Sequence, residues 1–306
     1  MIDYVLAVNK EVGWTSHDAV QRLRQVLRIR EIGHAGSLDP FATGVLVCGI
    51  GRGTKTLPFM LDLPKDYSGA MRLGKVTDSG DVTGRVIQEK PVGPIDLEQA
   101  RQLARRFIGF QEQIPPMLSA LRQNGKRLYD LARQGLEVER MPRTVEIRTF
   151  DILGLSGDLL EFRVICGRGT YIRTLAADYG AALGPGASVE RLHRRAVGSY
   201  DDTRAVSIEG DPEVVRQACQ RESVPMAAAL EHLPALTLRS EWVRRVRQGT
   251  QPPWRAILTE TVPEAKRFRL LGPESGLVAV ASLEPVPGLV DRAWKDSWEL
   301  RLDRVF

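Results

Sequence analysis

The chain has few of the residues that usually bind transition metals or form disulfides. Its 306 residues include three cysteines and four histidines. The cysteines form no C-x-x-C pair and the histidines no H-x-x-x-H pair, so we expect no metal site. Cys48 and Cys166 lie inside apolar runs and are predicted to be buried thiols. This usage favours a reduced, cytoplasmic compartment.

The sequence also lacks the apolar segments of membrane and exported proteins. No apolar run approaches the roughly 20 residues that a helix needs to span a bilayer. The chain begins Ile2-Asp3-Tyr4-Val5, without a basic stretch followed by an apolar one. We therefore expect no signal peptide and no membrane association.

The excess of positive over negative charge in the sequence is also small. Lys and Arg number 43 against 38 for Asp and Glu, a formal net charge of +5. This balance is compatible with a polyanionic partner such as RNA but does not require one. The 43% hydrophobic and 26% charged residues are ordinary for a globular protein with a sizeable core. At about 100–200 residues per domain, the length suggests two domains or one large one.

Apolar periodicity predicts strands interleaved with helices. Strands are expected at residues 5–8, 45–50, 66–73, 145–153, 159–166 and 277–281. Helices are expected after a capping-box-like start at Thr15 and Asp18, and at 96–108, 170–183 and 240–248. We therefore expect an α+β fold around an extensive sheet. A weaker boundary near residue 230 divides the chain into a domain of residues 1–229 and a small β-rich domain of residues 230–306.

The loop from Gly33 to Pro40 is the most suggestive candidate for a site. Its two glycines allow unusual backbone angles, and the Asp39-Pro40 step restricts the chain to an extended or turn geometry. Such a loop can hold the Asp39 carboxylate rigidly at a cleft. A tight turn in which Asp39 only caps nearby backbone explains the same pattern.

Two other loops carry incomplete ligand-binding patterns. The segment 49–56 has three glycines and Lys55, but a phosphate-binding loop needs glycine immediately before the lysine, where Thr54 stands. A phosphate contact from Arg52 or Lys55 stays open. The segment 77–84 has two aspartates but does not match a calcium-binding loop, so we expect a hairpin turn.

Basic residues gather in three further segments. Arg173 lies in the first turn of an expected helix, where it could meet a phosphate or a carboxylate or form a surface ion pair. Another cluster comprises Arg191, His193, Arg194 and Arg195. Such a run is usually a solvated face, and the segment 114–143 is also basic and irregular. Several basic clusters together favour an RNA partner.

Taken in order, these segments resemble the bacterial TruB-type tRNA pseudouridine synthases. Each matching block is short, and their joint order and spacing carry the resemblance. The blocks are 33–46 (GHAGSLDPFATGVL), 65–67, 73–74, 77–84, 115–116, 119–121, 124–126, 129–133, 169–175 (GTYIRTL) and 192–197. The tail from 233 to 249 is similar, less sharply, to the family's small PUA-like RNA-binding domain. The resemblance implies a pseudouridine synthase fold with a mixed, largely antiparallel sheet flanked by helices.

The resemblance also implies a function. It predicts isomerisation of uridine to pseudouridine at position 55 in the T loop of tRNA, with no cofactor and no metal. Asp39 is then the catalytic residue. The implied substrate-binding residues are Tyr67, which stacks on the flipped uracil, Arg173, which pairs with the aspartate, Leu192, which lines the pocket, His34, which holds the T loop open, and Lys65, a phosphate contact. The segment 114–143 is implied to close on RNA.

These roles are chemically consistent with one another. The reaction breaks a glycosidic bond and rejoins the base through carbon, so it adds no atoms and needs no redox partner. The carboxylate acts either as a nucleophile or as a base on the sugar, and the sequence does not choose. An arginine beside it favours the ionised form by lowering its pKa. Flipping a base costs a few kcal/mol, of which an aromatic stack returns about 1–3 kcal/mol.

Two other functions keep part of the pattern. A non-catalytic tRNA-binding or tRNA-folding protein would keep the basic clusters without needing Asp39. An NTP-dependent RNA enzyme would use residues 49–56.

The chain departs from the family's usual residues at Ala35, Leu118, Arg122 and His193, which affects fine contacts to RNA. We expect a monomer that binds the T arm of tRNA without an obligate protein partner.

Overall fold

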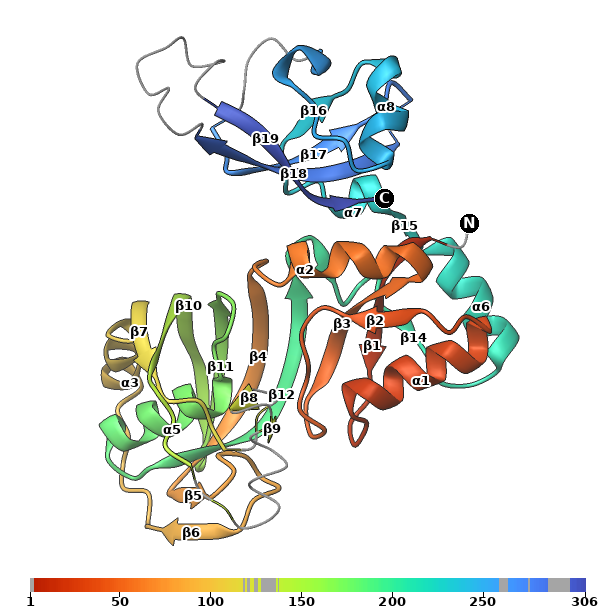
Figure 1. Ribbon diagram of the computed structural model, residues 1–306. Helices are drawn as coiled ribbons and strands as arrows, with labels where there is room; N and C mark the ends of the chain where they lie inside the picture. Colours follow the sequence, from red (N-terminus) through yellow and green to blue (C-terminus); the bar gives the residue numbers. More distant parts are fainter. Residues whose placement is uncertain are drawn as a thin grey trace.

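A mixed sheet of 11 strands forms the larger part of the computed structural model, along the path β14-β1-β3-β12-β4-β11-β10-β7 (Figure 1). The structure describes residues 3–258, 264–274, 276–285 and 298–306, apart from 118, 120–121, 124–125, 128–135 and 137. The strands are β1 (Tyr4–Lys10), β2 (Ile32–His34), β3 (Thr43–Ile50), β4 (Lys65–Leu73), β7 (Gly109–Gln113), β10 (Arg143–Ser156), β11 (Leu159–Cys166), β12 (Ala187–Val197), β13 (Tyr200–Asp201), β14 (Val206–Ser207) and β15 (Val224–Pro225).

Most neighbouring strands of this sheet are antiparallel. Within this sheet, only the pairs β1–β14 and β3–β12 run parallel among the described strands. The predicted α+β class, with a mixed and largely antiparallel sheet, is therefore confirmed. The parallel β3–β12 pair joins two halves of the sheet, and each half is covered by its own helices. At this junction, Thr43 and Gly44 at the start of β3 lie beside His193 and Arg194 of β12.

Helices α1 (Ser16–Leu27) and α6 (Pro212–Arg221) cover the half of the sheet that contains β1 and β3 (Figure 1). The capping box predicted for α1 is confirmed, because the Thr15 hydroxyl accepts from the Asp18 amide and the Asp18 carboxylate accepts from the Thr15 amide. Its apolar side, including Val20 and Leu23, is buried against the sheet. None of the described helices is both long and apolar enough to cross a bilayer.

Helices α3 (Leu97–Arg105) and α5 (Ile172–Leu183) cover the other half of the sheet. An aromatic cluster fixes α5 there: the ring of Tyr179 lies 5.2 Å from that of Phe150, centroid to centroid, with the two planes nearly perpendicular. The Tyr179 hydroxyl also donates to the Ala100 carbonyl of α3 (2.9 Å). Edge-to-face aromatic packing adds stabilisation beyond the area that it buries, so the position of α5 on the sheet is well defined.

The two segments with incomplete ligand-binding patterns form a hairpin and a 3-10 helix, and a phosphate contact from Arg52 or Lys55 stays a prediction. The hairpin predicted around residues 77–84 is confirmed, because β5 (Lys75–Thr77) pairs antiparallel with β6 (Val86–Glu89). The segment 49–56 ends β3 and forms the 3-10 helix η1 (Gly51–Thr56), followed by α2 (Leu57–Met60). A Cβ atom on Gly53 would lie 2.0 Å from the Tyr4 carbonyl oxygen. This glycine is therefore required by close backbone packing. A further small pair is β8 (Arg122–Gln123) with β9 (Lys126–Arg127).

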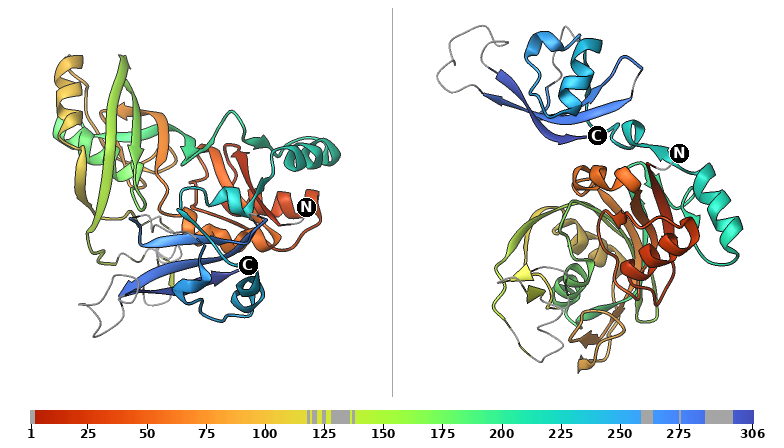
Figure 2. Two further views of the ribbon diagram at one scale, coloured as in Figure 1. Left: turned by 90° about the horizontal axis from the view of Figure 1, so that it is seen from above. Right: turned by 45° about the vertical axis from the view of Figure 1, so that its right-hand side comes forward.

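A second sheet of four strands follows in the chain, in the order β16-β17-β18-β19. Its elements are β16 (Ala235–Thr237), α8 (Ser240–Arg247), the 3-10 helix η2 (Trp254–Ala256), β17 (Arg267–Leu271), β18 (Leu277–Pro285) and β19 (Trp298–Val305). It has a core of its own that includes Leu236, Val246 and Phe268. The views in Figure 2 place this sheet beside α7 (Met226–Ala229). The division of the chain at residue 230 stays a prediction.

The elements that were not predicted from the sequence include α6 and the central strand β12. The cluster 191–195 was interpreted as a solvated basic face, which is wrong for one of its members. Arg194 is only 1% exposed and points into the protein, whereas Arg191 and Arg195 remain accessible. Because alternate residues of a strand point to opposite sides, a charged residue at an inward position hides the usual apolar alternation.

Candidate active site

The loop before β3 and the start of α5 enclose a cavity of about 250 Å³ together with β4 and β12. Five of the six predicted site residues line it: Asp39, Lys65, Tyr67, Arg173 and Leu192. They come from four separate segments of the chain, which the β12–β4–β11 part of the sheet brings together. The sixth residue, His34, is not among the lining residues.

Asp39 and Arg173 form a bidentate ion pair at one wall of this cavity. The Arg173 Nε lies 2.9 Å from Asp39 Oδ2, and Nη2 donates to Oδ1 (3.1 Å). Arg173 is 4% exposed, whereas the Asp39 side chain keeps 38% of its surface accessible. The Asp39 carbonyl accepts from the Ala42 amide (3.1 Å), so the loop does turn here, but among the described residues the Asp39 carboxylate accepts from no backbone amide and does not act as a local cap. Bidentate pairing fixes the orientation of the carboxylate as well as its charge.

The start of α5 is held so that Arg173 reaches the loop. α5 begins at Ile172, two residues later than expected, and Tyr171 at its N-cap has no side-chain cap of its own. The Gln113 side chain from the edge strand β7 supplies it, accepting from the Tyr171 amide (3.0 Å) and donating to the Tyr171 carbonyl (3.3 Å). A contact between distant segments thus replaces the local cap.

A second carboxylate, Asp81, lies on the other side of Arg173. Arg173 Nη1 is 3.5 Å from Asp81 Oδ2 and donates to the Ser79 carbonyl (2.9 Å). Asp81 is itself buried and accepts from the Thr83 amide (2.9 Å). The sequence interpretation treated Asp81 only as part of a hairpin turn and missed this role. Its place inside a matching family block was the one available signal.

The charge of Asp39 is under opposing influences. Burial raises the pKa of Asp39 above the ordinary aspartate value, and Arg173 opposes this rise. The neighbouring charge of Asp81 raises the pKa further, whereas Lys10 lowers it. Arg173 thus acts in the expected direction but does not outweigh burial.

Tyr67 and Leu192 form the sheet side of the cavity. Tyr67 of β4 lies opposite Arg194 of β12, and Leu192 lies opposite Gly69. Burial raises the pKa of the Tyr67 phenol, and the charge of Arg194 opposes that rise. Tyr67 therefore stays protonated at neutral pH.

Two buried lysines approach the site. The Lys65 ammonium donates to the Leu61 carbonyl (2.5 Å), and burial lowers its pKa to about 8. Its role as a phosphate contact stays a prediction. Lys10, which the sequence interpretation missed, is fully buried and donates to the carbonyls of Glu11 (2.9 Å), Trp14 (2.7 Å) and Pro40 (3.4 Å). Burial lowers its pKa to about 8 as well.

His34 lies at the end of β2, opposite Cys48 of β3. Burial and the charge of Arg194 lower its pKa, so its imidazole is neutral at pH 7. Its role beside RNA stays a prediction. Within the segment 114–143, most residues from 118 to 137 lie outside the described residues. The expectation that this segment closes on RNA falls on those residues. Within the described part of the chain, no three His, Cys, Asp or Glu side chains gather as metal ligands.

Comparison with known proteins gives the family. A model described as "TruB family pseudouridylate synthase (N terminal domain)" matches residues 24–172. The tRNA pseudouridine synthase B of Geotalea uraniireducens is 38% identical over 308 residues, covering 100% of this chain and 98% of the relative. That of Geobacter sulfurreducens is 39% identical over 311 residues, covering 100% of both. The chain belongs to the TruB family of pseudouridine synthases.

Solved structures agree with the fold of this TruB-family chain. A Cbf5-Nop10-Gar1 complex matches with a TM-score of 0.75 at 23% identity, covering 100% of this chain and 84% of that one. An H/ACA RNP bound to a substrate RNA containing 2'-deoxyuridine matches with a TM-score of 0.74 at 22% identity, covering 100% and 85%. At these identities the likeness establishes the fold alone. The family membership makes the chain a pseudouridine synthase, which is an isomerase, as the resemblance implied.

Proposed function

We propose that this TruB-family enzyme converts uridine to pseudouridine at position 55 in the T loop of tRNA, with Asp39 as its catalytic residue. The relatives that match along the whole chain are named as tRNA pseudouridine synthases B, which supports the substrate class. One observation supports the catalytic role most directly. Asp39 is a partly exposed carboxylate that faces the cavity while Arg173, 4% exposed, holds both of its oxygens.

The cavity suits a single nucleotide that has left its stack. Its volume of about 250 Å³ lies just under the range of about 300–1,000 Å³ that is usual for small-molecule pockets. A base can be reached only after it is flipped out of the T loop. Tyr67 offers an aromatic surface for the uracil, and Leu192 offers an apolar wall. We propose that His34 occupies space in the T loop while the base is outside.

The proposed chemistry takes place at the sugar carbon that bears the base. The C1′–N1 bond breaks, the uracil turns, and a C1′–C5 bond forms, after which C5 loses its proton and N1 gains one. Asp39 acts either as the nucleophile at C1′ or as a base on the sugar. In both cases it must be ionised, and Arg173 stabilises that form. No atom is gained or lost by the RNA.

RNA binding is proposed to involve parts of the chain beyond the cavity. We propose that residues 1–229 carry the chemistry and that the PUA-like residues 230–306 bind RNA. The basic segment 114–143 and Lys65 are proposed as further contacts to the backbone of the T arm. Phosphate contacts of this kind position an RNA without reading its bases.

The test uses unmodified tRNA transcript, purified enzyme and chelator, with no added nucleotide, and maps pseudouridine by chemical stops. We expect one new pseudouridine in the T loop with wild-type enzyme and none with Asp39→Asn, whose tRNA binding should survive. The matched control is Asp96→Asn, because Asp96 only caps α3 and asparagine caps equally well.

Other outcomes of this assay identify the alternatives. Pseudouridine at another position would keep the chemistry and move the target. Tight tRNA binding without any pseudouridine would favour the tRNA-folding role. Full activity of Asp39→Asn would remove Asp39 from the mechanism, and product that appears only with added nucleotide would favour an NTP-dependent enzyme.

A further inference from the structure

Arg194 is the largest side chain that the described protein buries completely. Its guanidinium has no carboxylate partner within ion-pair distance among the described residues. It donates instead to three backbone carbonyls: Nε to Val45 (2.7 Å), Nη2 to Gly36 (3.1 Å) and Nη1 to Ser37 (3.3 Å). Burying an unpaired cation is strongly unfavourable unless its donors are satisfied. The buried guanidinium therefore needs these three carbonyls as acceptors, and their hydrogen bonds to it fix their positions.

The carbonyls that Arg194 binds belong to the loop that carries Asp39. Gly36 and Ser37 lie three and two residues before Asp39, and Val45 lies just beyond the loop. The loop is fixed at other points by neutral contacts and by Lys10. The Ser16 hydroxyl accepts from the Leu38 amide (2.8 Å), and the Pro40 carbonyl accepts from the Gly13 amide (2.8 Å). Arg194 supplies the contacts on the side of the loop nearest the cavity, which it also lines.

Arg194 also reaches the other half of the site. It lies opposite Tyr67 in the β12–β4 pair, and both side chains line the cavity. One guanidinium thus binds the backbone that carries the carboxylate and lies beside the aromatic side chain of the neighbouring strand. A lysine ammonium could not span these positions, because its donors radiate from one atom.

We propose that Arg194 is a positioning residue for the isomerisation. It fixes the Asp39 loop and Tyr67 in one relative geometry before the base enters. The proposal rests on the proposed role of Asp39, since it concerns how that carboxylate is placed. Displacement of reacting groups by about 1 Å can lower a rate about 100-fold. Loss of Arg194 should therefore reduce the chemical step and leave tRNA affinity nearly unchanged.

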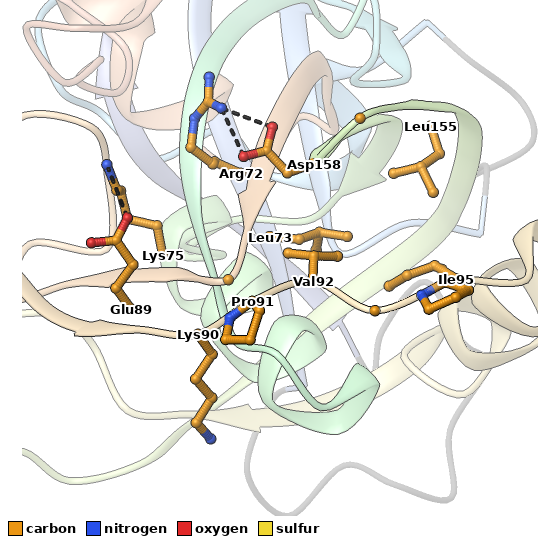
Figure 3. Close-up of a pocket in the computed structure, with 14 residues that line it drawn as sticks. Arg72, Leu73, Lys75, Glu89, Lys90, Pro91, Val92, Ile95, Leu155 and Asp158 are labelled. Atoms are coloured by element: carbon orange, nitrogen blue, oxygen red, sulfur yellow. Dashed lines mark hydrogen bonds and ion pairs between the residues drawn. The ribbon is translucent and has the colours of Figure 1, made fainter.

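The test compares Arg194→Lys with Arg72→Lys, the same change at a partly buried arginine that does not line this cavity. Arg72 pairs with Asp158 (2.8 Å) beside a separate cavity of about 680 Å³ (Figure 3). It also pairs with Glu190 (2.9 Å). Thermal unfolding, tRNA Kd and single-turnover rates are measured below the Tm of the less stable variant. We expect Arg194→Lys to lower the single-turnover rate about 10- to 100-fold with less than a threefold change in Kd. Arg72→Lys should keep the wild-type rate.

A second variant keeps the test decisive if the lysine variant is unstable. Arg194→Ala leaves space for a guanidinium, and added ethylguanidinium should restore part of the rate whereas ethylammonium should not. An unchanged rate, a loss confined to Kd, or equal rescue by both cations would overturn the proposal. The wild-type assay on the same transcript separates this result from the proposed function. If wild type modifies a different uridine, the Arg194 comparison is made at that uridine. If Asp39→Asn keeps its activity, it is the role of Asp39 that fails.

Discussion

Among single residues, Asp39 is the proposed catalytic group, and its surroundings shift its pKa in opposite directions. The same contacts that orient the carboxylate also remove it from water, so its pKa rises even though Arg173 lies beside it. Buried polar groups at enzyme sites often combine orientation with a shifted pKa. For a group that must be ionised to react, the raised value sets the acid limit of activity.

The acid limb of kcat/KM should therefore lie above the ordinary aspartate pKa of about 3.9. Activity is full above the raised pKa of Asp39 and falls tenfold for each pH unit below it, since only the ionised form reacts. Arg173→Met removes the charge that lowers this pKa and should move the limb to higher pH as well as reduce the rate. The measurement is a pH profile of single-turnover modification, with circular dichroism confirming the fold at each pH.

The control for this profile is Asp96→Asn, which leaves the surroundings of Asp39 intact and should not move the limb. A wild-type limb near pH 4, or a limb that moves to lower pH in Arg173→Met, would contradict the electrostatic account.

The sequence predicted these residues unevenly. Asp39, Tyr67, Leu192 and Arg173 were named because short blocks in a fixed order resemble a family, and the structure brings them to one cavity. Spacing alone left Asp39 between a turn and a site. Asp81, Lys10 and Arg194 were missed in their roles because each acts through a contact with a distant segment. Such contacts leave no periodic signal in the sequence.

At the scale of secondary structure, elements that are stabilised by residues close in sequence could be predicted, and elements that depend on distant segments could not. The start of α1 was predictable because a capping box involves residues three apart. Strand β12 was not, because its buried arginine is satisfied by carbonyls of another segment. The two parallel neighbours β3 and β12 approach closely at Gly44, where a Cβ atom would lie 2.3 Å from the Arg194 carbonyl oxygen.

Gly44→Ala should consequently be far more destabilising than an ordinary glycine replacement. Gly44 has a φ of +104° and faces backbone at 2.3 Å, so alanine adds overpacking of about 1–3 kcal/mol to a backbone cost of about 1–2 kcal/mol. Urea unfolding should show a loss of about 3 kcal/mol or more. Because β3 and β12 meet beside the Asp39 loop, the rate should fall too.

Gly157→Ala is the matched control for this prediction. Gly157, in the turn between β10 and β11, also has a positive φ (+62°), but a Cβ atom added there would meet no atom within 4 Å beyond its chain neighbours. The alanine variant should lose only the backbone component of about 1–2 kcal/mol and keep its activity. Equal losses at both glycines would show that close approach of β12 contributes nothing.

At the scale of the whole molecule, the described protein is built mainly on two sheets, one of 11 strands and one of four. The larger sheet carries the cavity, and the smaller one packs against it through a shared buried apolar cluster that includes Val47, Val280 and Phe306. The Arg267 guanidinium adds a contact 5.3 Å from the Phe59 ring centroid, and Arg269 donates to the Ala227 carbonyl of α7 (2.6 Å). The sequence predicted the α+β class and a β-rich tail. It did not predict the strand order, since that depends on pairings between distant segments.

The arginines exposed on α8 offer a test of whether the smaller sheet binds RNA. Arg244 and Arg247 are exposed on this helix. If they contact phosphates, Arg244→Gln with Arg247→Gln should weaken tRNA binding and lower the slope of log Kd against log salt by about 1.4–1.8, at about 0.7–0.9 per contact. The rate at saturating tRNA should stay at the wild-type value, because the cavity is untouched. The matched control is Arg105→Gln with Arg106→Gln, two arginines exposed at the end of α3. An equal change of the salt slope in the α8 and α3 double variants would indicate general electrostatics and not a defined RNA surface on the smaller sheet. An unchanged slope in the α8 double variant would place the phosphate contacts elsewhere.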